Sequence, residues 1–114
     1  MPYLSIHTNQ SLSNEAAGAL AGQASKLVAA KLGKPERYVM VRIKGGETML
    51  FAGSDAPLAY LELKSIGLPV NTTGELSKAL CELLQQTLAI DPARIYIEFA
   101  NASGNLWGWD SGTF

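Results

Sequence analysis

The chain has 114 residues, of which 9 are Lys or Arg and 10 are Asp or Glu, so its formal net charge is -1. This length suits one domain with one core, and the near-neutral charge excludes a broad basic surface for nucleic acid or for an anionic membrane. Cys81 is the only cysteine. An internal disulfide and a cysteine-based zinc site are therefore excluded, and we expect a reducing compartment, no metal and no cofactor.

The amino terminus shows no secretory leader, which would have a basic segment followed by an apolar one. No apolar run approaches the roughly 20 residues that a membrane helix needs. We therefore expect a cytoplasmic protein that has neither a membrane nor a nucleic acid as a partner. Export by a route without a leader stays open.

The first half of the chain predicts a strand, a helix and a second strand. Apolar residues alternate in the first segment, recur at helical spacing in the second, and are β-branched in the third. The expected elements are a strand at 2–8, a helix from its cap Ser13 to Gly33, a strand at 38–43 and a short further strand at 49–51. His7, the lone histidine, lies on the first strand and is expected to be structural.

The second half predicts the same order of elements. Thr72 with Glu75 three residues later forms the pattern of a capping box ahead of a leucine-rich helix, which Asp91-Pro92 is expected to end. The other expected elements are a strand at 58–64, an exit loop at 65–69, a strand at 94–99 and a last short strand at 106–109.

The two halves also match residue by residue. The spacing from Tyr60 to Pro92 in the second half equals the spacing from Tyr3 to Pro35 in the first half. We therefore predict one domain, 1–114, made of the pseudo-repeats 1–57 and 58–114. Right-handed crossovers predict an α+β fold in which a tandem β-α-β repeat packs two helices on one face of a four-stranded mixed sheet. The other face also needs a cover, and a partner subunit in an oligomer is the simplest one.

Pro2 can present a free amine, whereas its equivalent in the second pseudo-repeat, Ala59, lies inside the chain and cannot. If an aminopeptidase removes Met1, the chain begins with the secondary amine of Pro2 at the tip of a strand. Burial and a nearby cation lower the pKa of such an amine toward pH 7, so that it can be neutral and act as a base. The simpler alternative is that Pro2 only begins an edge strand, where proline is tolerated.

Taken together and in order, several short segments resemble the tautomerase superfamily, specifically the family of macrophage migration inhibitory factor and D-dopachrome tautomerase. The matching segments are Met1-Pro2 with the following strand, Gly33-Lys34-Pro35 with Tyr38, Met49 to Phe51 with Gly53-Ser54, Ser65-Ile66-Gly67, Ser77-Lys78 with Leu80-Cys81, Arg94 to Ile97, and Gly108-Trp109 with Thr113-Phe114. The resemblance implies a homotrimer with a pocket at each subunit boundary.

The resemblance also implies roles for individual residues. Pro2 matches the catalytic proline, and Lys34 matches the lysine that meets the substrate carboxylate. The other matches are a backbone contact at Ile66 with Ser65 beside it, a tyrosine from the neighbouring subunit at Tyr96, and aromatic residues at the pocket mouth, Tyr38, Trp109 and Phe114.

Three residues depart from the family pattern. Glu98 replaces a substrate-contacting asparagine, Trp107 replaces a smaller aliphatic residue, and Lys64 replaces a histidine. Glu98 is expected to oppose an anionic substrate unless it turns away or pairs with Lys34 or Lys64, and Trp107 is expected to narrow the pocket or to pack at a subunit interface.

The predicted function is a cofactor-free tautomerase that interconverts the keto and enol forms of phenylpyruvate-like α-keto acids, with Pro2 as general base. A cytokine-like module that binds a protein receptor and has weak or vestigial activity is the alternative. A third possibility is proton transfer to, or hydration of, an unsaturated acid.

Overall fold

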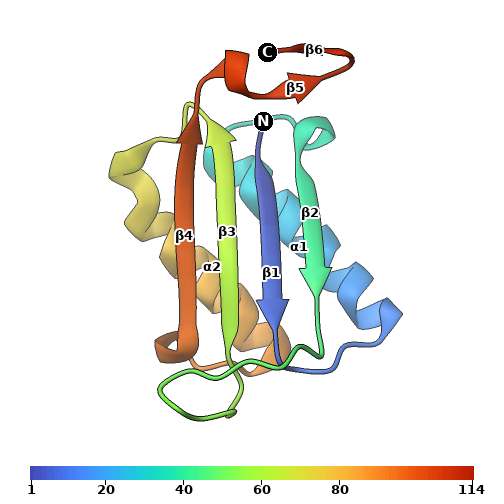
Figure 1. The fold of residues 1–114 in the computed structure, drawn as a ribbon, viewed down its shortest axis with the longest axis vertical. Coiled ribbons are helices and arrows are strands. Elements are labelled where there is room, and N and C mark those ends of the chain that lie inside the picture. The colour runs from blue at the N-terminus through green and yellow to red at the C-terminus, as the bar shows by residue number, and fades with distance from the viewer.

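The computed structural model describes all residues 1–114 and places both helices against one face of a four-stranded sheet (Figure 1). The strand order is β2-β1-β3-β4, and the predicted mixed α+β architecture is confirmed. The elements are β1 (Tyr3–Thr8), α1 (Asn14–Leu32), β2 (Met40–Lys44), β3 (Ala59–Ile66), α2 (Thr73–Leu88), β4 (Ile95–Ala102), β5 (Gly108–Trp109) and β6 (Gly112–Thr113).

The sheet joins two parallel pairs through an antiparallel centre. β1 pairs with β2 and β3 pairs with β4 in parallel, and a helix connects the strands of each pair. β1 and β3 pair antiparallel, so that Tyr3 lies opposite Lys64 and Thr8 lies opposite Ala59. The start of β1 therefore lies beside the end of β3, at the same end of the sheet as the β5–β6 hairpin (Figure 1).

The core lies between the sheet and the helices. Alternate residues of the central strands, including Leu4, Ile6, Leu61 and Leu63, have no exposed surface and meet the buried faces of both helices. In α2 the buried leucines recur at the four-residue spacing that places them on one face, at Leu76, Leu80 and Leu84. Each such fully buried leucine contributes about 1.5–3 kcal/mol of transfer free energy. Neither helix is both long and apolar enough to cross a membrane.

Helix α1 begins and ends as predicted. The side chain of Ser13 accepts a hydrogen bond of 3.0 Å from the backbone N–H of Ala16. At the other end Gly33 adopts a left-handed conformation with φ 63°, which glycine reaches without the clash that a Cβ would cause. The chain then turns directly into Lys34.

The predicted capping box of α2 is wrong. Thr72 makes no capping bond, because its backbone, with φ -109° and ψ 6°, is not in the extended conformation that an N-cap residue needs. Its hydroxyl donates to the Pro69 carbonyl at 2.8 Å, at the end of the short 3-10 helix Val70–Thr72. The helix also ends earlier than predicted. Its last residue is Leu88, and Ala89 turns the chain in a left-handed conformation with φ 54°.

Several strand boundaries differ from the prediction. β2 begins at Met40, because Tyr38 closes a short 3-10 helix, and residues 49–51 contribute only the bridge between Phe51 and Ser54. β3 runs to Ile66, where an exit loop was predicted. The exit loop was misplaced because pairing with β4 continues to Ala102 and holds the chain extended.

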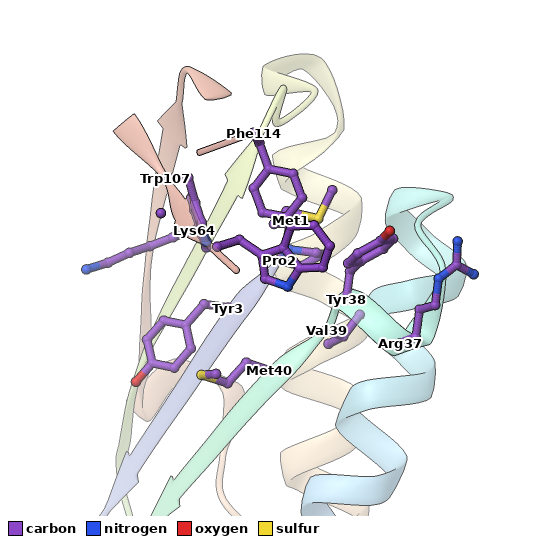
Figure 2. Close-up of a pocket in the computed structure, with 12 residues that line it drawn as sticks. Met1, Pro2, Tyr3, Arg37, Tyr38, Val39, Met40, Lys64, Trp107 and Phe114 are labelled. Atoms are coloured by element: carbon purple, nitrogen blue, oxygen red, sulfur yellow. The ribbon is translucent and has the colours of Figure 1, made fainter. Parts of the chain in front are cut away.

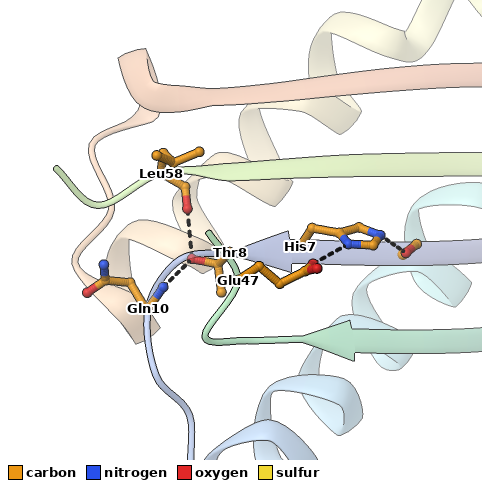
Figure 3. Close-up of polar contacts among 6 residues, drawn as sticks. His7, Thr8, Gln10, Glu47 and Leu58 are labelled. Carbon is orange, nitrogen blue, oxygen red and sulfur yellow. Dashed lines mark hydrogen bonds and ion pairs between the residues drawn. The ribbon is translucent and has the colours of Figure 1, made fainter. Parts of the chain in front are cut away.

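The face of the sheet away from the helices is polar near its centre. The Nδ1 atom of His7 lies 2.6 Å from a Glu47 carboxylate oxygen, and Nε2 lies 2.9 Å from the Ser5 hydroxyl (Figure 3). On the other side of β1, which carries Leu4 and Ile6, the buried hydroxyl of Thr8 donates to the Leu58 carbonyl at 2.7 Å. His7 thus has a partner at both ring nitrogens, as expected for a structural histidine.

Candidate active site

A pocket of about 340 Å³ lies at the end of the sheet where β1 begins, beneath the β5–β6 hairpin (Figures 1 and 2). Its wall combines the first residues of the chain, the segment before β2 and the carboxyl-terminal hairpin. The lining residues are Met1, Pro2, Tyr3, Arg37, Tyr38, Val39, Met40, Lys64, Trp107, Gly108, Trp109 and Phe114.

Pro2 lies at the base of this pocket. Its carbonyl accepts a hydrogen bond of 3.0 Å from the Met40 N–H, and its side chain is buried. Proline is tolerated at the start of a strand, because its missing N–H does not remove a hydrogen bond from the sheet there. In Figure 2 the Pro2 ring lies between Tyr38 on one side and the stem of Lys64 on the other, close to Met1. The strand therefore holds this residue in one place.

Three aromatic rings form one wall. The ring of Tyr38 meets Trp109 at 5.8 Å and Phe114 at 6.0 Å, both edge to face. The hairpin holds Phe114 in place because its N–H donates to the Trp107 carbonyl at 3.2 Å. Gly104 allows this closure, since a Cβ there would lie 3.0 Å from the Phe114 carbonyl. The wall is suited to an aromatic ligand.

The charged side chains in the lining, Arg37 and Lys64, are both cationic. The Arg37 guanidinium lies 4.8 Å above the ring of Tyr38, and the Lys64 ammonium pairs with Glu62 at 3.4 Å. Lys34 follows the end of α1, and its positive charge interacts electrostatically with the amine of Met1. Burial, and secondly the charge of Lys34, lower the pKa of that amine below its ordinary value of 8.0. The pocket therefore disfavours a protonated amine and favours an anionic ligand.

Two predicted site residues lie far from Pro2 within the chain. Tyr96 is the second residue of β4 and pairs with Tyr60, which pairs with His7 near the end of β1. Tyr96 is 65% exposed. Glu98 lies two residues further on, where it accepts a hydrogen bond of 3.4 Å from the Tyr60 hydroxyl. Neither residue lines this pocket.

Ser65 and Ile66 lie at the same end of the sheet as Pro2, but they do not line the pocket. They follow Lys64, which pairs with Tyr3. Ser65 is completely buried, on the same side of β3 as Leu63, and its hydroxyl donates to the Ile66 carbonyl at 3.3 Å. The structure thus brings together Pro2 and the predicted aromatic residues Tyr38, Trp107, Trp109 and Phe114, with Lys34 nearby.

Sequence reasoning missed several lining residues, namely Met1, Tyr3, Arg37, Val39, Met40, Lys64 and Gly108 as members of the site. A signal was available for three of them. Tyr3, Met40 and Lys64 are paired across the strands and alternate with core residues, so they share the face away from the helices. Arg37 gave no such signal, because isolated cations on a surface are common.

The comparisons with known proteins agree along the whole chain. The family model described as macrophage migration inhibitory factor matches residues 1–114. A macrophage migration inhibitory factor homologue of Brugia malayi is 38% identical over all of this chain and 99% of its own, and the Mus musculus factor is 33% identical with the same shares. The crystal structure of a homologue from Prochlorococcus marinus superposes with a TM-score of 0.93 at 38% identity, covering 98% of both chains.

Proposed function

The chain belongs to the macrophage migration inhibitory factor family, and from this premise we propose that it is a cofactor-free keto–enol tautomerase that acts on phenylpyruvate-like α-keto acids. One observation carries the proposal. The amine of Met1, the residue attached to Pro2, lies in an aromatic pocket in which burial and secondly Lys34 lower its pKa. We expect the same surroundings to lower the pKa of the Pro2 amine once Met1 is removed, so that this amine is neutral, and therefore basic, at a lower pH than an ordinary one.

Pro2 is the proposed base. The activity requires removal of Met1, because the Pro2 nitrogen is a non-basic amide while Met1 is attached. In ketonisation the free amine takes the proton from the enol hydroxyl, and the carbon–carbon double bond takes a proton from the resulting ammonium at the carbon next to the carbonyl. The amine is thereby returned to its neutral form, so that no cofactor is consumed.

Lys34 and the aromatic wall are proposed to hold the substrate. The ammonium of Lys34 meets the substrate carboxylate and stabilises the negative charge that develops on oxygen. The rings of Tyr38, Trp109 and Phe114 meet the aryl group, so we expect a preference for aryl pyruvates.

A homotrimer completes the proposed site. Tyr96 and Pro2 lie at opposite ends of the sheet, so Tyr96 reaches a pocket only if it belongs to a neighbouring subunit. Residues exposed on the uncovered face, such as Met40 and Tyr96 at 65% each, support a partner on that face. Light scattering should give three times the 12.1 kDa of one chain. A monomer at micromolar concentration would contradict this assembly.

The decisive experiment follows ketonisation of enol phenylpyruvate by three forms of the protein. They are the wild type with Met1 shown to be absent by intact mass, Pro2→Gly, and a form that retains Met1. We expect turnover in the wild type and a loss of about 100-fold or more in the other two, the size of a general-base effect. Equal rates in all three would exclude Pro2 as the base. A wild type without turnover would instead favour the protein-interaction alternative.

A further inference from the structure

Arg94, the residue just before β4, contacts one surface segment with its whole guanidinium group. Nε donates to the Pro57 carbonyl at 3.1 Å, and Nη1 donates to the Phe51 carbonyl at 3.2 Å. Nη2 donates to the carbonyls of Ser54 at 3.0 Å and Ala56 at 3.1 Å. One side chain thus binds four backbone carbonyls of residues 51–57, which only the planar fork of arginine can do.

The other hydrogen bonds of this segment come from the segment itself and from Asn9. Residues 52–57 are exposed, and the turn is closed by the bridge between Phe51 and Ser54. Ala52 adopts a left-handed conformation with φ 53°, which is unfavourable for a residue with a side chain. Asn9 adds a bond of 2.8 Å to the Asp55 carbonyl. The conformation of the turn therefore depends strongly on Arg94.

The same arginine is linked to Tyr96 through a ring. The Arg94 guanidinium lies 5.3 Å above the ring of Phe51, and that ring lies 4.6 Å from the ring of Tyr96. Because Tyr96 is 65% exposed, few contacts within the subunit restrict its side chain. Phe51 is the aromatic ring that packs against Tyr96 in this subunit.

We propose that Arg94 is a positioning residue for the pocket of a neighbouring subunit. Through Phe51, Arg94 holds the Tyr96 ring in the orientation in which that ring contacts a substrate bound in the pocket of the neighbouring subunit. This inference rests on the proposed function, because Tyr96 lies too far from Pro2 of its own chain to serve the same subunit.

Steady-state kinetics on phenylpyruvate test the role of Arg94. Arg94→Gln removes the fork, and we expect KM to rise about 3- to 10-fold with kcat nearly unchanged, the size of one aromatic contact. Phe51→Leu leaves the carbonyls in place and removes the intervening ring, so it should give the same rise even if Arg94→Gln folds poorly. Lys26→Gln, an exposed charge deletion on α1, is the control and should change neither constant. A purely structural defect would lower kcat and leave KM unchanged.

Mixed assemblies test whether the effect passes between subunits. Arg94→Gln and Pro2→Gly subunits are refolded together, so that some pockets combine Pro2 from the first with Tyr96 from the second. We expect a fraction of the activity to recover the wild-type KM. A mixture that keeps only the raised KM, or an Arg94→Gln protein with a normal KM, would overturn the inference and leave the proposed function intact. A wild type without turnover would overturn both.

Discussion

The indole ring of Trp109 stacks on the phenyl ring of Phe114, with ring centroids 5.1 Å apart and planes inclined by 14°. Both residues belong to the hairpin that follows the main sheet, and both meet Tyr38 edge to face. The last residues of the chain and the segment before β2 thus build one surface above Pro2. This arrangement makes the hairpin part of the pocket rather than an appendage.

Phe114→Ala should weaken the binding of aromatic substrates selectively. Each aromatic pair contributes about 0.5–1.5 kcal/mol, so we expect KM for phenylpyruvate to rise about 3- to 10-fold, whereas KM for a small aliphatic α-keto acid changes little. Steady-state kinetics on both substrates give the comparison. An equal change for the two would mean that the ring only stabilises the hairpin.

Lys34→Ala should shift the pH dependence of turnover. The charge of Lys34 lowers the pKa of the Met1 amine, and we expect it to lower the pKa of the Pro2 amine in the same way once Met1 is removed. Because the neutral amine is the base, the wild-type rate should rise with pH and level off at a lower pH than the rate of Lys34→Ala. Without the cation the pKa rises and the profile moves to higher pH. Lys34→Arg keeps the charge and should keep the wild-type midpoint. A profile that does not move in Lys34→Ala would show that Lys34 acts on the substrate alone.

Glu98→Gln should change the titration of Tyr60. Burial first, and then the negative charges of Glu98 and Glu62 and the hydrogen bond to Glu98, raise the pKa of the Tyr60 phenol above 10.0. Removing the charge of Glu98 lowers that pKa toward its ordinary value, which NMR of labelled tyrosine can follow. If Glu98 also approaches a neighbour's pocket, the same variant should bind anionic substrates more tightly, because a repulsive charge is lost.

Leu84→Ala should destabilise the fold without touching the pocket. Leu84 is completely buried on the inner face of α2, and truncating such a residue costs about 2–5 kcal/mol of unfolding free energy. Denaturant unfolding measures the loss. Leu106→Ala, at a position that is 78% exposed, is the matched control and should change stability by less than about 0.5 kcal/mol.

Local chemistry explains which predictions succeeded and which failed. Ser13 and Gly33 end α1 as expected, because a side-chain cap and a left-handed glycine act within a few residues. Thr72 carries the same kind of capping signal, yet it makes no capping bond, because the preceding 3-10 turn holds its backbone away from the extended conformation of an N-cap residue. Ser65 was placed in a loop but lies in β3, because the pairing with β4 extends further than the local pattern indicates.

The sequence by itself determined the two helices, the four main strands to within a few residues, the sheet-and-helix architecture and the position of Pro2 at a strand tip, because hydrophobic periodicity is a local property. Only the tertiary structure decided that the carboxyl-terminal hairpin covers Pro2, that Arg37 and Lys64 join its pocket, and that Tyr96 and Glu98 lie away from it. These relations depend on strand order and register, which bring together residues far apart in the chain and leave no mark in the spacing of its residues.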